Sequence, residues 1–86
     1  MHEMSIAQEI CGIARDTVGE DEVSRVVTVG VEVGSDSGVE ADNLLFWLEI
    51  LLKEDPFEGA TPVLERVEGD SLRVSYMEVK DAGPED

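Results

Sequence analysis

The chain has 86 residues, 42% of them hydrophobic, and its 21 acidic against 6 basic residues give a formal net charge of −15. This length fits one small domain, predicted over residues 1–80, followed by a flexible acidic tail over residues 81–86. The negative charge disfavours nucleic-acid binding, and no apolar run approaches the roughly 20 residues of a membrane span. Because a basic and hydrophobic leader is lacking, the sequence predicts a cytoplasmic protein.

The first predicted helix opens at Ser5, where Ser5 and Gln8 have the spacing of a capping box. An apolar stripe at helical spacing follows: Ile6, Ile10, Ile13, Ala14, Thr17 and Val18. Gly19 is expected to end this helix. Residues 1–4 would then precede the helix as a short strand.

A strand is predicted over residues 24–34, with the valines at positions 27, 29, 31 and 33 alternating onto one face. A second helix is expected from about residue 41 to 54, ending before Pro56. Apolar side chains surround most of this helix, so it is either sandwiched between layers or forms part of an interface. For Trp47, Leu48 and Leu51 the alternatives are core packing and an interface with a partner.

Two further strands are predicted over residues 61–67 and 72–79, joined as a hairpin by the turn residues Glu68, Gly69 and Asp70. Pro62 indicates an edge strand or a strand start. The predicted fold is therefore α+β, a small mixed sheet of three to four strands with two helices packed on it. The expected order is β-α-β-α-β-β.

Most catalytic arrangements are excluded by the residue inventory, so we expect no enzyme. The single histidine, His2, is a poor basis for a buried triad, and neither a phosphate loop nor a dinucleotide fingerprint is present. The single cysteine, Cys11, provides neither a disulfide nor a zinc site, and no structural zinc is expected. Cys11 lies beside the apolar stripe and is interpreted as a buried small hydrophobe.

One local group of atoms can bind a metal without the rest of the fold. The Met1 α-amine, the backbone nitrogen and imidazole of His2, and the backbone nitrogen of Glu3 can form fused chelate rings around one ion. In-plane nitrogen donors suit Ni(II) or Cu(II). Because binding displaces protons, the affinity should fall as the pH drops. A solvated terminal histidine is the alternative interpretation.

The opening residues Met1-His2-Glu3-Met4-Ser5 resemble the start of the HypA family of hydrogenase nickel-incorporation proteins. The resemblance continues through three further segments: Gly38-Val39-Glu40 leading into Leu44-Leu45-Phe46, then Glu58-Gly59-Ala60, and finally Gly69 to Val74 with Met77-Glu78-Val79. It covers the chain to about residue 80. It differs at one place, since the family's zinc lobe with two CxxC pairs is replaced here by Glu68-Gly69-Asp70.

The resemblance implies Ni(II) binding through Met1, His2 and Glu3, in a metallochaperone-like accessory protein for the maturation of a nickel enzyme, expected to be a hydrogenase. The implied partners are a HypB-type GTPase and the precursor of the hydrogenase large subunit, and a homodimer is left open. The alternative is a HypA-like protein–protein interaction module that has lost the zinc lobe and no longer delivers metal.

Overall fold

The computed structural model describes residues 2–80, so Met1 and the predicted tail over residues 81–86 lie outside the described residues. In chain order the elements are α1 (Glu3–Val18), the short 3-10 helix η1 (Val23–Arg25), β1 (Val26–Gly34), α2 (Ala41–Leu51), β2 (Thr61–Val67) and β3 (Leu72–Val79). The α+β class is confirmed. The order is α-β-α-β-β, so the predicted initial strand was wrong.

Helix α1 begins at Glu3, two residues before the predicted capping box. His2 is its N-cap residue. The backbone N–H of Ile6 donates to the His2 carbonyl at 3.2 Å, while the His2 side chain makes no capping hydrogen bond. Glu3 favours this early start because a carboxylate in the first turn interacts well with the helix dipole. It is also held by hydrogen bonds from the start of α2.

The three strands form a mixed sheet in the order β2-β1-β3. β1 pairs in parallel with β2 and antiparallel with β3, so the predicted hairpin between the last two strands was wrong. The segment between β2 and β3 instead passes around the end of β1. There Ser71 accepts a hydrogen bond from the Gly34 N–H, and Gly69 accepts one from the Asp36 N–H. Pro62 lies on edge strand β2, as predicted.

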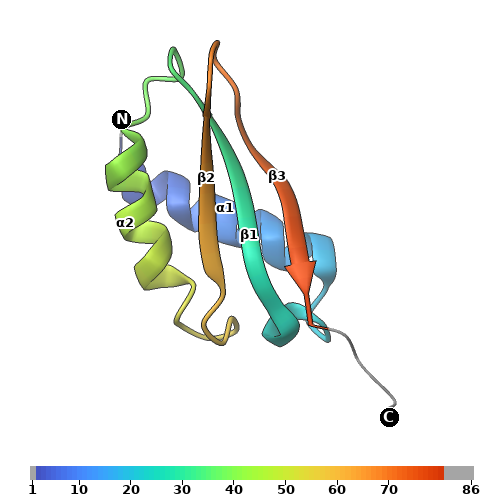
Figure 1. The fold of residues 1–86 in the computed structure, drawn as a ribbon. Helices are drawn as coiled ribbons and strands as arrows, with labels where there is room; N and C mark the ends of the chain where they lie inside the picture. The colour runs from blue at the N-terminus through green and yellow to red at the C-terminus, as the bar shows by residue number, and fades with distance from the viewer. Residues whose placement is uncertain (1, 81–86) are drawn as a thin grey trace.

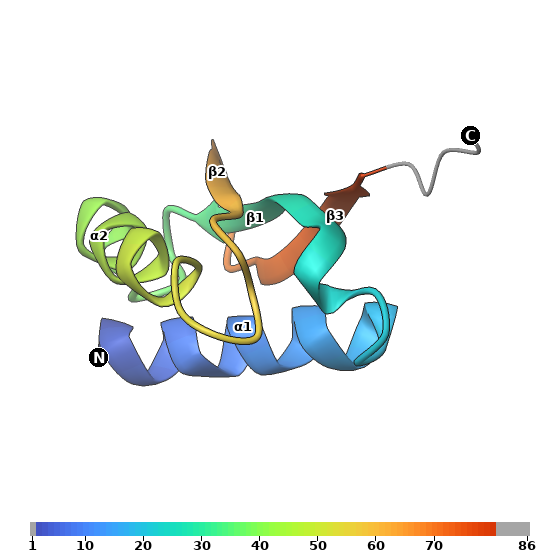
Figure 2. The same cartoon turned by 90° about the horizontal axis from the view of Figure 1, so that it is seen from below.

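Helix α1 runs across one face of the sheet, and α2 lies beside β2 and packs against α1 (Figures 1 and 2). No helix among the described residues covers the opposite face (Figure 2). The core lies between the helices and the sheet. Its fully buried side chains include Ala7, Ala14, Val29, Val31, Leu44, Leu48 and Leu52. Within residues 2–80 no helix has the length and apolar character needed to cross a bilayer.

Two details of the predicted apolar patterns differ. Val27 is exposed while Val26 is buried, because the pairing register of β1 with β3 shifts between Val26 and Thr28 and so turns one residue outward. On α1, Ile13 is 53% exposed, and the buried stripe is formed by Glu3, Ala7, Ile10 and Ala14. The earlier helix start makes Glu3 the first member of that stripe.

Candidate metal centre

The first residues of α1 and the first turn of α2 lie side by side (Figure 1). Between them is a shallow depression of about 300 Å³, lined by His2, Glu3, Met4, Ser5, Asn43 and Trp47. His2 is exposed, with φ −89° and ψ 99°. An imidazole at this place is accessible to an ion from solvent.

Glu3 is the only charged residue of the described chain that is buried, with 9% of its surface exposed. One carboxylate oxygen, Oε2, accepts from the backbone N–H of Glu40 at 2.9 Å, and Oε1 accepts from Nδ2 of Asn43 at 3.2 Å. The Glu40 hydrogen bond is the main cause that lowers the pKa of Glu3, desolvation opposes the shift, and smaller lowering contributions come first from the backbone N–H of Glu3 itself and then from Asn43. The carboxylate is therefore ionised and already satisfied by protein donors.

The backbone nitrogens at this helix end are free of helical hydrogen bonds. The first N–H groups of any α-helix have no carbonyl partner within the helix, and α1 starts at Glu3. Deprotonating the amide of His2 or Glu3 therefore breaks no hydrogen bond of the helix. Among residues 2–80 no group of three or more His, Cys, Asp or Glu side chains is placed to hold a metal.

Comparison with known proteins assigns the chain as a whole to a family. The HypA family model, described as "Hydrogenase/urease nickel incorporation, metallochaperone, hypA", matches residues 1–79. A hydrogenase maturation factor HypA from Azoarcus sp. (strain BH72) is 41% identical over 69 residues, covering 80% of this chain and 60% of that protein. The chain belongs to the HypA family.

Other HypA proteins show a similar degree of sequence identity. Hydrogenase maturation factors HypA from Chloroflexus aurantiacus and Geobacter metallireducens are 40% and 41% identical to this chain. The alignments cover 78% and 80% of this chain, and 59% and 60% of the two relatives. The chain thus spans about 60% of the length of these HypA relatives. The description of the HypA family is that of a metallochaperone and not of an enzyme.

The three residues predicted for an interface on α2 lie in different environments. Leu48 is fully buried in the core and contributes no surface. Leu51 is half-buried and packs against the core, and so is Trp47, whose ring meets that of Phe46 edge to face at a centroid distance of 5.4 Å. The exposed apolar side chains of α2 are Phe46 and Ile50, at 53% and 37%. An interface through Trp47 stays a prediction.

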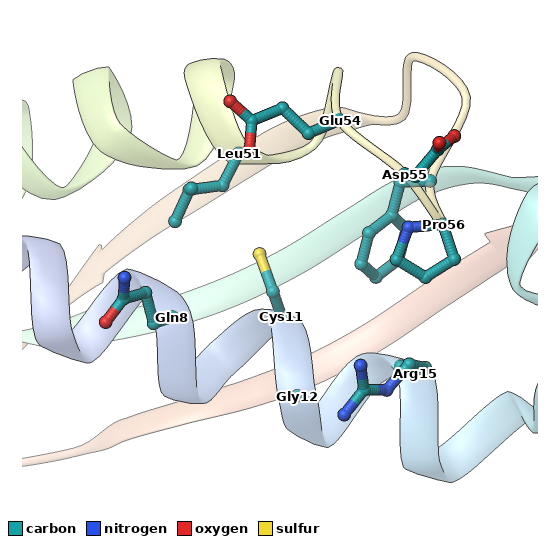
Figure 3. A pocket seen from close by; sticks show the side chains of 9 residues that line it. Gln8, Cys11, Gly12, Arg15, Leu51, Glu54, Asp55 and Pro56 are labelled. Carbon is teal, nitrogen blue, oxygen red and sulfur yellow. The ribbon is translucent and has the colours of Figure 1, made fainter.

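Cys11 lies in a second depression, away from the N-terminus of α1. Figure 3 shows its sulfur pointing from α1 toward Leu51 and Glu54, with Pro56 on the same wall. Burial, with a smaller effect of the Glu54 carboxylate, raises the pKa of the thiol to about 11. Cys11 is therefore a neutral thiol packed against the core, close to the predicted role of a small hydrophobe.

Sequence reasoning missed Glu40 and Asn43. The Glu40 carboxylate caps α2 by accepting from the Asn43 N–H at 3.1 Å. Glutamate is not among the residues preferred at this position, so the sequence carried little signal for the cap. The bonds to Glu3 have no such signal, since the partners are 37 and 40 positions apart.

Proposed function

We propose that this chain binds one Ni(II) ion at its N-terminus and delivers it during the maturation of a nickel enzyme, expected to be a hydrogenase. Membership of the HypA family carries the proposal. The exposed His2 and the backbone nitrogens of the helix start, which have no partner within the helix, support it. In the proposed setting the chain works in the cytoplasm with a HypB-type GTPase and the precursor of the hydrogenase large subunit.

The proposed donors are the Met1 amine, the His2 backbone nitrogen and imidazole, and the Glu3 backbone nitrogen. Two amide protons leave when the ion binds, so the two amide anions balance the charge of Ni²⁺. This balance matters because the N-terminus of a helix disfavours a net positive charge. The surrounding negative charge of the protein also attracts the free cation.

The connectivity of the donors restricts their arrangement. Around one ion, the amine, the imidazole and the Glu3 nitrogen would each close a chelate ring that includes the His2 nitrogen. In a square plane, however, only two donors can stand next to the His2 nitrogen. If all four nitrogens held one ion, they would therefore not form the fully planar set expected from the sequence. Such an ion would keep a coordination position for a water molecule or for a donor of the receiving protein, which would suit transfer.

Binding through Glu3 also requires a backbone rotation. Its nitrogen can chelate with the His2 nitrogen only if the two are nearly eclipsed about the His2 Cα–C bond, and the observed ψ is 99°. Rotation about this bond would move the His2 nitrogen and imidazole relative to the helix. The His2 carbonyl and the Glu3 nitrogen share one peptide plane and stay with the helix. The hydrogen bond from Ile6 to that carbonyl is thereby retained.

Calorimetric titration of the untagged protein with Ni(II), Zn(II) and Cu(II) tests the proposal. We expect one Ni(II) per chain, loss of binding in His2→Ala, and weaker binding as the pH falls because protons compete for the donors. A cleavable N-terminal extension provides the matched control: the extended protein should not bind, and cleavage that frees the Met1 amine should restore binding. An intact protein that takes up no nickel would refute the proposal.

A second candidate function is an interaction module that delivers no metal. The exposed Phe46 and Ile50 on α2 favour it, because apolar side chains on one helix face are typical of a docking surface. In that case His2→Ala would leave partner binding unchanged, while Phe46→Ser would weaken it. Pull-down of a nickel-enzyme maturation partner with the two variants separates the candidates.

A further inference from the structure

The hydrogen bonds around Glu3 join two helix starts that are far apart in the sequence. The Glu3 carboxylate accepts from the backbone of Glu40 and from the side chain of Asn43. Asn43 in turn donates its backbone N–H to the Glu40 carboxylate at 3.1 Å. Asn43 is thus the residue of α2 that bonds both carboxylates, one through its side chain and one through its backbone.

We propose that Asn43 is a positioning residue for the N-terminal metal site and acts through the Glu3 carboxylate. The inference rests on the proposed nickel binding. Glu3 is both the last proposed donor and the first helical residue, so fixing its side chain against α2 also fixes the peptide whose nitrogen is the proposed donor. A donor held in place before binding loses less conformational entropy when the ion arrives.

The carboxylate of Glu3 is a poor candidate for a direct nickel ligand. Both of its oxygens are occupied by protein donors, and moving it to an ion would leave the Glu40 N–H and the Asn43 amide without these partners. Partners that orient a metal ligand typically change metal affinity by about 10- to 100-fold when they are removed. Asn43 bonds the Glu3 carboxylate, whereas the proposed donor is the Glu3 backbone nitrogen. Because Asn43 acts on the donor only indirectly, we expect a smaller effect on nickel affinity.

Nickel affinity of the full chain, measured by calorimetry with Ni(II) as the only ligand, tests the role of Asn43. Asn43→Ala is expected to weaken binding about three- to tenfold. Asn43→Gln, which keeps an amide donor, should recover part of the loss. Glu49→Ala, which truncates another exposed side chain of α2, should bind like the wild type. Alanine is the better helix former, so a loss in Asn43→Ala cannot come from helix propensity.

A double-mutant cycle shows whether Asn43 acts through Glu3. In a Glu3→Ala background the Asn43→Ala change should alter nickel affinity by less than about twofold, because the carboxylate it holds is gone. The absorption spectrum of bound nickel should change in Asn43→Ala and stay as in the wild type in Glu49→Ala.

The outcomes separate the two proposals. A wild-type chain without nickel uptake refutes the proposed function itself. If the wild type binds and Asn43→Ala matches Glu49→Ala, nickel binding stands and the role of Asn43 is refuted. Two further results would refute the role of Asn43. One is an Asn43→Gln variant that binds nickel no more tightly than Asn43→Ala. The other is an Asn43→Ala change that weakens nickel binding as much in the Glu3→Ala background as in the wild type.

Discussion

Glu3 contributes two separable parts to the proposed site, a backbone nitrogen that can bind nickel and a carboxylate that binds α2. Sequence reasoning identified Glu3 as a site residue from its place beside His2, and the structure adds that its side chain is engaged elsewhere. The distinction could not be predicted, because it depends on which residues of α2 arrive next to the N-terminus after folding.

Two substitutions at position 3 separate these parts. Glu3→Ala removes the carboxylate and keeps the backbone N–H, whereas Glu3→Pro removes both. Proline is well tolerated at the first position of a helix, so both variants should fold. If the Glu3 nitrogen is a donor, Glu3→Pro should bind Ni(II) more weakly than Glu3→Ala, by roughly tenfold or more. Equal affinities in calorimetry would remove the Glu3 nitrogen from the donor set.

Cys11 should react slowly while the protein is folded. Its pKa is raised to about 11, so at pH 8 almost all of it is the unreactive thiol. Iodoacetamide should therefore alkylate Cys11 more slowly in buffer than in denaturant at the same pH. The folded form holds the Cys11 proton more tightly than the unfolded form does. The contribution of this group to the free energy of unfolding is therefore present below about pH 9 and should be lost as the pH rises toward 11. Equal alkylation rates in the two states would contradict the burial of this thiol.

At the scale of elements, helix α2 shows what an apolar pattern leaves undecided. Its sequence is apolar on most sides, so periodicity alone identified neither the core face nor the exposed face. The structure buries Leu44, Leu48 and the C-cap residue Leu52 and leaves Phe46 exposed, because α2 packs mainly against α1 and edge strand β2. The helix was predictable, and its orientation was not.

Alanine substitutions on the two faces of α2 should therefore have unequal effects. Leu48→Ala creates a cavity in the core and should lower the free energy of unfolding by about 2–5 kcal/mol. Phe46→Ala changes an exposed position and should stay within about 0.5 kcal/mol of the wild type. Urea denaturation followed by circular dichroism measures both. Similar losses would mean that α2 is covered on both sides in solution, for example by a second copy.

The arrangement of β2 and β3 is the part of the fold that local signals predicted incorrectly. Glu68-Gly69-Asp70 has the composition of a hairpin turn, yet β1 lies between the two strands. β1 buries Val29, Val31 and Val33 and is the strand that pairs on both sides, so a central place suits its apolar face. Turn composition predicts a change of direction and does not reveal which strands pair.

Gly34 is the residue on which the path between β2 and β3 depends most directly. A Cβ added there would lie 2.7 Å from the Ser71 nitrogen and closer still to the Gly69 carbonyl oxygen. Since both neighbours are backbone, Gly34→Ala should destabilise the fold by roughly 1–3 kcal/mol. Gly12→Ala is the control, because nothing lies within 4 Å of its added Cβ, and it should be neutral or stabilising by up to about 1 kcal/mol. Thermal unfolding distinguishes them, and a stable Gly34→Ala would refute the close passage.

At the scale of the whole molecule, the dominant feature is the excess of negative charge. The structure gives four ion pairs within residues 2–80, and nearly all of their side chains are well exposed. Exposed pairs of this kind contribute little, about 0–1 kcal/mol each. With 21 acidic residues against 6 basic ones, most carboxylates have no cation to offset them. Repulsion among carboxylates should therefore outweigh attraction in the folded chain.

Added salt should stabilise the protein for this reason. Ions at about 0.1 M shorten the range of charge interactions to about 10 Å, which weakens both the attractive pairs and the more numerous repulsive ones. We expect the unfolding midpoint temperature to rise between low salt and about 0.5 M NaCl, and to rise equally in KCl, since screening depends on ionic strength and not on the cation. A Lys53→Glu variant, which removes one of the six cations and adds a carboxylate, should start lower and gain more from salt. A midpoint that falls with salt would mean that the ion pairs outweigh the repulsion among the carboxylates.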